Sequence, residues 1–297
     1  MKSRRPTAAA LLLCTLPALV CSAPPPDQVA TSLAALNAVC RSAIDSHKFD
    51  TALRLCKRVS FDASKLAPGS QAHITSLINI GDIKSLTENY IDADACYATA
   101  LALVEKADGK DSPQAVQLLT MMVEMKTKRG KFLDAEVLMQ QLLATLEKTT
   151  GTEDATVAVI AARYADVLSQ NRQFPEAELT YSRAIRVLER AGPESTEAYA
   201  LAVRHLAEMY ERRAQYSQAE AQYRRLLDIV ERQALGDAAL ATTLDRLANV
   251  CEEQNKWSEA AQLYRREMST LGAAASAPET IGRVQAKLAS VERQPIP

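Results

Sequence analysis

The fold is decided by a stretch that reads QFPEAELTYSRAIRVLER, residues 173–190. Its apolar residues recur three or four positions apart, which predicts an amphipathic helix. Proline and two glutamates stand in the first turn of this helix, where both are favoured. Residues 157–168 have the same periodicity, and a short polar turn at 171–173 separates the two segments. Residues 157–190 are therefore predicted to form two antiparallel helices.

The same pattern recurs along the chain, although aromatic residues make up only 5% of it. An aromatic residue returns at intervals of 41 or 42 positions, at Phe49, Tyr90, Phe132, Phe174, Tyr216 and Trp257. An alanine follows each of them by three positions, at Ala52, Ala93, Ala135, Ala177, Ala219 and Ala260. A further slot comes four residues later, at Cys56, Tyr97, Met139, Tyr181, Tyr223 and Tyr264. A fixed period of this length predicts a repeat array, and the small residue lets two helices approach closely.

Residues 129–136 and 173–184 resemble tetratricopeptide repeats (TPRs), which mostly have 34 residues. The 42-residue period is similar to the long variant of kinesin light chains. The resemblance implies an all-α, right-handed superhelical solenoid of six hairpins over residues 23–271, the first of them degenerate. Residues 278–292 are predicted to form one further helix that caps the array.

Residues 1–22 have the layout of a secretory signal peptide. Basic residues precede an apolar run at 8–20, which is shorter than the roughly 20 residues needed to span a bilayer. Cleavage is expected after Ser22, and Cys21 leaves a lipoprotein open as the disfavoured alternative. We therefore expect an exported protein, periplasmic or secreted, without a transmembrane anchor.

Signals for catalysis are missing from the sequence. His47, His73 and His205 are the three histidines, and they fall in different repeats, so a shared metal site is not expected. No phosphate-binding glycine loop or nucleophile elbow occurs. A net charge of −1 without a basic stripe disfavours nucleic acid as a partner. We expect no enzyme, no metal and no cofactor.

Cys40 and Cys56 stand nine residues before and seven residues after Phe49. In an antiparallel pair that turns just before Phe49, these positions face each other. Export would permit a disulfide, and closing a loop of about 15 residues would contribute about 3 kcal/mol. The alternative is that both are small buried residues with free thiols. Cys96 and Cys251 are expected to be unpaired.

Polar residues also follow the repeat on the first helix of each hairpin. One column contains Asn79, Met121, Arg163, His205 and Arg246, and a second contains Asp82, Glu124, Asp166, Glu208 and Asn249. In one interpretation, Arg163, Arg204, His205 and Arg246 bind an acidic or extended segment of a partner in a concave groove. In the other, Arg163 pairs with Asp166, and Arg204 pairs with Glu208, on their own helices.

The sequence therefore predicts a non-catalytic scaffold of the cell envelope that binds a peptide or helix of a protein partner in its groove. One alternative is a structural protein that assembles end to end through its terminal helices. Another is an accessory repeat domain of an enzyme, which is disfavoured because few residues remain outside the signal, the repeats and the cap.

Overall fold

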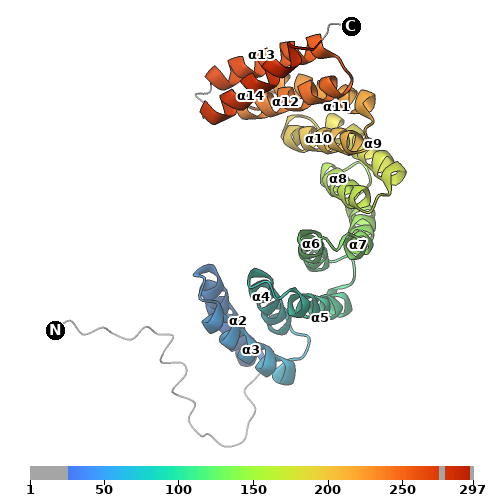
Figure 1. The fold of residues 1–297 in the computed structure, drawn as a ribbon. Coiled ribbons are helices and arrows are strands. Elements are labelled where there is room, and N and C mark those ends of the chain that lie inside the picture. Colours follow the sequence, from blue (N-terminus) through green and yellow to red (C-terminus); the bar gives the residue numbers. More distant parts are fainter. Residues whose placement is uncertain (1–25, 274–277, 295–297) are drawn as a thin grey trace, which may run out of the picture. The chain divides into compact units, whose positions relative to one another are not determined.

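The computed structural model describes residues 26–273 and 278–294. These residues form thirteen α-helices and one short 3-10 helix, with no β-strand among them (Figure 1). Within the same residues, no helix combines the length and the apolar character that a membrane span requires. The predicted signal peptide, with Cys21, lies outside the described residues.

The first of two compact units ends at Ala107. Its helices are α2 (Pro26–Asp45), α3 (Phe49–Leu66), α4 (Gln71–Leu86) and α5 (Tyr90–Asp108). They form the first and second hairpins, and α4 packs against both α2 and α3. Cys40 and Cys56 form a disulfide between α2 and α3, with Cα atoms 5.8 Å apart, within the usual range for such bridges. Cys96 and Cys251 are free.

The second unit begins at Asp108 and contains four hairpins and a final helix. The helices are α6 (Pro113–Lys128), α7 (Phe132–Thr150), α8 (Ala155–Gln170), α9 (Phe174–Arg190), α10 (Thr196–Arg212), α11 (Tyr216–Arg232), α12 (Asp237–Glu253), α13 (Trp257–Ala273) and α14 (Pro278–Val291). The short helix η1 (Pro193–Ser195) precedes α10. From α7 onward, the second helix of each hairpin packs against the first helix of the next, and α14 packs on α13. The all-helical fold, the six hairpins and the final helix are confirmed.

The predicted spacing of the repeat matches the starts of the second helices and the residues that are packed between the helices. Every second helix starts at one of the six recurring aromatic residues. All six alanines of the pattern are fully buried, and the tyrosines that follow four of them are at most 3% exposed. The aromatic residues are half-buried, because each lies at the end of its hairpin. Small residues therefore form the closest helix contacts, and large residues fill the space beside them.

Each tyrosine has a partner position sixteen residues earlier, on the first helix of its hairpin. This facing slot contains Cys40, Gly81, Val123, Ala165, Ala207 and Ala248. At Gly81 the contact is direct, since a β-carbon there would lie 2.5 Å from the ring of Tyr97. The residue that faces a tyrosine must therefore be small. The third hairpin differs, because Val123 faces Met139.

The turns inside the hairpins share one conformation. The residue two positions before each aromatic has a positive φ, at His47, Glu88, Gly130, Arg172, Ala214 and Asn255. The N–H of the next residue donates to the carbonyl five positions earlier, as in the 2.9 Å bond from Gln173 to Leu168. This is the Schellman bond that closes a helix C-terminus, and it normally favours glycine. Only Gly130 is a glycine, so five turns accept a less favourable residue.

Candidate protein-interaction surface

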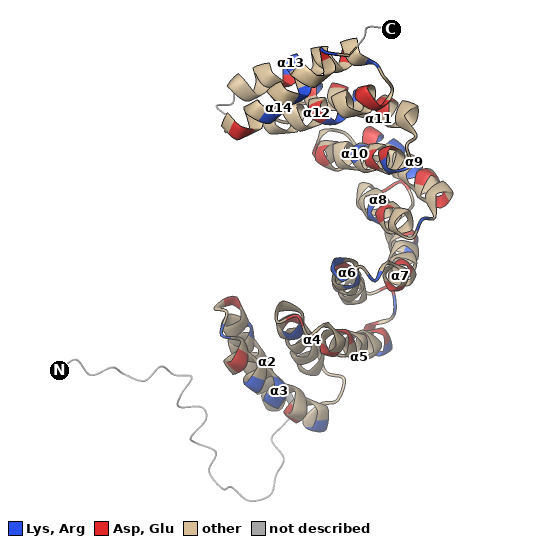
Figure 2. Ribbon diagram, in the orientation of Figure 1, with Lys and Arg blue, Asp and Glu red and all other residues tan. Residues whose placement is uncertain are grey.

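The first helices of the second unit carry most of the predicted contact residues. Glu124 lies on α6, Arg163 and Asp166 on α8, Arg204, His205 and Glu208 on α10, and Arg246 on α12. All seven side chains reach solvent to some extent. Figure 2 shows basic and acidic residues on most helices of this unit. We call the surface formed by α6, α8, α10 and α12 the first-helix face.

Asn79 does not share this exposure. It lies on α4 in the first unit, and only 3% of its surface is accessible. The helix period places residue 79 in the same column as Arg163, but packing against the neighbouring helix covers it. Asn79 therefore leaves the set of candidate contact residues.

Several charges on the first-helix face pair between successive hairpins. Arg163 Nη1 lies 3.7 Å from Glu124 Oε1, and Arg246 Nη1 lies 3.6 Å from Glu211 Oε1. His205 Nδ1 lies 2.8 Å from Asp166 Oδ1. In each case the basic residue reaches back to an acid of the preceding hairpin. The expected pairing of Arg163 with Asp166 is thus replaced by two contacts between repeats.

The pairing expected within α10 is observed. Arg204 Nε lies 3.7 Å from Glu208 Oε1, four residues later on the same helix. Both side chains remain partly exposed, so this pair contributes little to stability. Pairing within one helix is therefore observed for Arg204 and not for Arg163.

Buried tyrosines of the second helices donate hydrogen bonds to residues of the second polar column. The hydroxyl of Tyr97 donates to Asp82 at 2.7 Å, and Tyr181 donates to Asp166. The hydroxyl of Tyr264 shares its hydrogen between Asn249, at 2.8 Å, and Glu252. Asp82, Asp166 and Asn249 each stand fifteen residues before the tyrosine. Burial, with the nearby Asp166, raises the pKa of Tyr181 above its ordinary value, so it stays a hydrogen-bond donor.

The third hairpin of the second unit, formed by α10 and α11, uses a different acceptor. Tyr223 donates at 2.6 Å to Glu211, not to Glu208, which lies fifteen residues before it. Glu208 is consequently left to pair with Arg204. Sequence spacing identified the column but not this shift by one helical turn.

A pocket of about 550 Å³ opens on the first-helix face between α6, α7 and α8. Its floor is apolar, and its rim is polar and charged. The floor contains Val123, Met139, Leu142, Ile160 and Val167, and the rim includes Glu124, Lys128, Arg163, Asp166 and Gln170. A volume of this size fits one large side chain of a ligand with part of its backbone.

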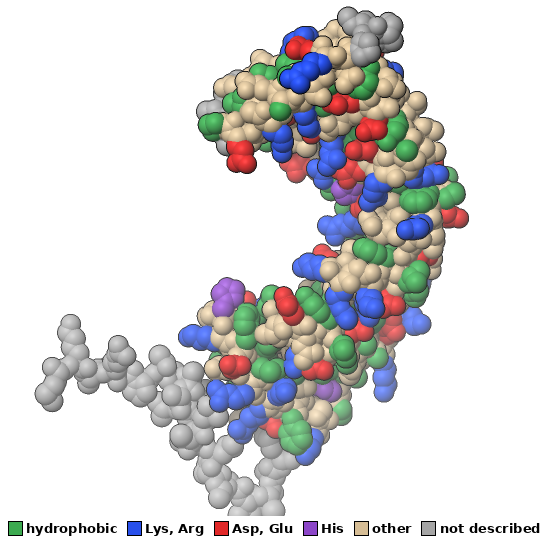
Figure 3. All heavy atoms as spheres, viewed as in Figure 1, with side chains coloured by type: hydrophobic (Ala, Val, Ile, Leu, Met, Phe, Trp, Pro, Cys, Tyr) green, Lys and Arg blue, Asp and Glu red, His purple; other side chains and the backbone are tan. Residues whose placement is uncertain are grey.

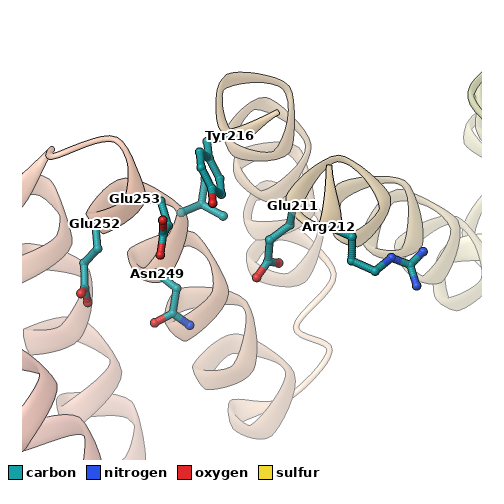
Figure 4. A pocket seen from close by; sticks show the side chains of 7 residues that line it. Glu211, Arg212, Tyr216, Asn249, Glu252 and Glu253 are labelled. Atoms are coloured by element: carbon teal, nitrogen blue, oxygen red, sulfur yellow. The ribbon is translucent and has the colours of Figure 1, made fainter. Parts of the chain in front are cut away.

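A second depression, of about 360 Å³, is acidic (Figure 4). It is lined by Glu211, Arg212, Tyr216, Asn249, Val250, Glu252 and Glu253. Two of its carboxylates are already bound by buried phenols, since Glu211 accepts from Tyr223 and Glu252 accepts from Tyr264. These acids therefore help to hold the hairpins together.

An apolar depression of about 410 Å³ lies beside Arg204, between α10, α11 and α12. Leu201 is exposed at its edge, and Leu226 and Val230 contribute from α11. The first-helix face thus combines apolar hollows with arginines. Figure 3 shows exposed Lys and Arg side chains, interspersed with acids, over the part of the second unit that contains these helices.

Glu220 is a buried acid that the sequence analysis missed. Lys256 Nζ and Gln254 Nε2, both in or next to the turn of the next hairpin, bind it at 2.6 and 2.7 Å. Arg224 on its own helix lies 2.6 Å away. Burial alone would raise the pKa of Glu220, but the contacts with Lys256, Gln254 and Arg224 hold it below the ordinary value. Glu136 binds Asn171 and Gln173 of the following turn in the same way.

The sequence contains a signal for these contacts of Glu136 and Glu220, because an Ala-Glu dipeptide recurs at residues 135–136, 177–178 and 219–220. Glu220 also lies within 4.8 Å of Cys251 and Glu259, the one group of possible metal ligands among the described residues. Lys256 and Arg224 already neutralise its carboxylate. Burial and the charge of Glu220 raise the pKa of Cys251 to about 11, so the thiol stays protonated. The group is therefore better described as an ion-pair network.

Comparison with known proteins agrees with the architecture. Residues 197–271 match the family model for the tetratricopeptide repeat. No curated protein matches the chain. The solved structures described next share less than 20% identity with this chain, so their similarity concerns the fold alone.

Three of these structures cover most of this chain. One is a putative kinesin light chain of Podosopora anserina with nearly identical TPR-like repeats (15% identity, 70% of this chain and 98% of that chain, TM-score 0.58). Another is BtubC (BKLC) from P. vanneervenii (17% identity, 82% and 93%, TM-score 0.61). The apo form of RapI is also similar (12% identity, 88% and 70%, TM-score 0.59).

Proposed function

We propose, from the tetratricopeptide-repeat solenoid that this chain forms, that it is a non-catalytic scaffold of the cell envelope. Such solenoids are typical of proteins that bind other proteins. The proposed binding site is the first-helix face of the second unit, which would hold a peptide or a helix of the partner. The observation that supports this best is the row of exposed arginines beside apolar hollows on that face.

The three arginines of this row are available to a partner. Arg163, Arg204 and Arg246 are 54%, 43% and 45% exposed, and their ion pairs are long, at 3.6 to 3.7 Å. Exposed pairs of this kind contribute about 0 to 1 kcal/mol. A carboxylate of the partner can therefore replace the internal acid at small cost and gain a charge-assisted hydrogen bond. His205 is less suited to this role because Asp166 binds it closely.

The test is capture of partners from the native envelope by the purified chain. We expect the R163E/R246E variant to lose partners that the unaltered chain retains, with an unchanged far-ultraviolet circular dichroism spectrum. R232E/R265E is a matched control, because it makes the same charge change at exposed arginines of second helices. If capture survives in R163E/R246E, or is lost equally in the control, the first-helix face is not the site.

Export is part of the proposal and rests on the layout of residues 1–22. A disulfide between Cys40 and Cys56 fits an oxidising compartment. N-terminal sequencing of the protein from fractionated cells provides the test. We expect it to begin at Ala23 in the exported fraction, and a chain that begins at Met1 in the cytosol would contradict the proposal.

End-to-end assembly through the last hairpin is disfavoured. Val284 and Val291 of α14 are buried, and α14 packs on α13. The final helix thus covers the apolar surface that another copy would need.

A further inference from the structure

The tyrosine slot of the repeat has an exception in the hairpin formed by α6 and α7. Four of the six hairpins have a buried tyrosine there, and its hydroxyl donates to a polar residue of the first helix. The first hairpin fills the slot with the Cys40–Cys56 disulfide. Only the third hairpin has neither, because Met139 occupies the slot.

Val123 explains why a tyrosine does not fit there. The facing slot holds glycine or alanine wherever a tyrosine is present, and Val123 is the larger residue opposite Met139. At Gly81 even one added carbon would clash with the ring of Tyr97. Val123 and Met139 are thus a matched pair that excludes an internal phenol.

Glu124 lacks the tyrosine donor that three of its four counterparts in the column have. It stands fifteen residues before Met139, the position from which Asp82, Asp166 and Asn249 accept a tyrosine hydroxyl. Its side chain is 56% exposed, and its ion pair with Arg163 spans 3.7 Å. Glu208 also lacks this donor, but Tyr223 fills the slot of its hairpin and donates to Glu211. Of the five hairpins that have the column, only that of α6 and α7 therefore combines an exposed acceptor with the absence of an internal phenol.

The 550 Å³ pocket lies at this exception. Val123 and Met139 form part of its floor, and Glu124 stands at its rim. The pocket offers an apolar base and an exposed acceptor, which are the two features that the buried tyrosines use in the neighbouring hairpins. Its opening on the first-helix face makes it accessible from outside.

We infer that this pocket binds a tyrosine side chain of the partner, with the ring on Val123, Met139 and Leu142 and the hydroxyl donating to Glu124. The partner then supplies the phenol that the third hairpin lacks. This inference rests on the proposed function and names the side chain that the site selects. The apolar base alone would accept any large apolar side chain, so the hydroxyl is the distinguishing contact.

The experiment uses p-cresol as the tyrosine side chain and toluene as its analogue without the hydroxyl. Methyl NMR spectra of the full chain report on Val123, Met139 and Leu142 during each titration. We expect p-cresol to shift these signals and to bind roughly tenfold more tightly than toluene, as a hydrogen bond to a charged acceptor predicts. In Glu124→Ala this preference should disappear while toluene binding remains. Equal affinities in the unaltered chain would overturn the inference.

A variant that supplies the phenol internally tests the site itself. V123A/M139Y gives the third hairpin the alanine and tyrosine of its neighbours, and we expect it to lose binding of both probes. The reverse exchange, A165V/Y181M, should create a second site for p-cresol in the next hairpin. If V123A/M139Y does not fold, the loss of preference in Glu124→Ala decides the question.

The outcome can be separated from that of the proposed function. If p-cresol fails to bind while R163E/R246E still loses its partner, only the tyrosine inference is wrong. If p-cresol binds as expected and the arginine variant still captures its partner, the pocket stands and the proposed contacts of the arginines do not.

Discussion

Glu267 predicts a pH-dependent stability of the last hairpin and its cap. It lies on α13, is only 2% exposed, and its Oε2 atom has no hydrogen-bond partner among the described residues. The charged groups nearest to it are Asp245 on α12 and Arg283 and Lys287 on α14. Lys287 binds Asp245 and Asn249, so that Lys287 and Arg283 offset the burial of the Glu267 carboxyl only in part.

The structure gives the size and the sign of the effect. Burial, with the charge of Asp245, raises the pKa of Glu267 from 4.5 to about 7. The folded chain therefore holds the proton more tightly than the unfolded chain. The stabilisation is complete below pH 4.5 and is lost as the pH rises through 7. At about 1.4 kcal/mol per pKa unit, the difference amounts to roughly 3 kcal/mol.

The perturbation is Glu267→Gln, which keeps the shape of the protonated carboxyl and cannot ionise. We expect the variant to match the unaltered chain at about pH 3.5, below the unfolded pKa, and to exceed its stability at pH 8 by about 3 kcal/mol. Hydrogen exchange of α13 and α14, corrected for the intrinsic effect of pH, is the appropriate assay. In an array the terminal hairpin can open without the rest.

The exposed Glu279 on α14 provides the control, because Glu279→Gln removes a carboxylate that is already solvated. Its protection should follow that of the unaltered chain at both pH values. The same pH dependence in Glu267→Gln and in the unaltered chain would show that Glu267 does not carry a raised pKa, and the reasoning would be refuted.

Three further predictions concern other parts of the fold. Ala214→Gly should stabilise the chain by about 0.5 to 1 kcal/mol in urea denaturation, because φ is +55° at this turn. Glu220→Gln should destabilise it by about 2 kcal/mol at pH 7; since the folded pKa is lowered, this difference should shrink as the pH falls below 4.5. The chain under non-reducing conditions should weigh about 2 Da less than the fully reduced chain, because one disulfide joins Cys40 to Cys56.

Each of these has a result that would contradict it. The reverse change Gly130→Ala should be destabilising, so a gain there would remove the argument from φ. Glu259→Gln, at the exposed acid beside Glu220, should change stability by less than about 0.5 kcal/mol. The chain that begins at Ala23 has four cysteines, and alkylation of all four without prior reduction would rule out the bridge.

The register of the fold could be predicted from sequence because close packing tolerates few residue types. Every hairpin needs a fully buried alanine between its two helices. The spacing of these alanines is therefore regular, while the surface residues differ from repeat to repeat. The six aromatic residues identified the start of each second helix for the same reason. The signal peptide and export remain predictions.

The pairing on the first-helix face could not be predicted in the same way. Arg163 and Asp166 are neighbours on α8, yet each pairs with a different hairpin because the stacked repeats bring other charges closer. Glu208 stands fifteen residues before Tyr223, the spacing of the acceptors of Tyr97 and Tyr181, yet Tyr223 donates to Glu211, one helical turn later. Long polar side chains have several acceptors of similar energy, and only the stacking selects among them.

The Schellman turns limit where the length of this chain can change. Each hairpin turn is closed by the same bond over five residues, so an insertion there would break both the bond and the start of the next helix. The connections before α8 and α10 lack this bond and differ in form, with a glycine turn at Gly151 before α8 and a 3-10 helix before α10. Epitope tags or reporter peptides can therefore be introduced at these connections, where they should leave every hairpin intact.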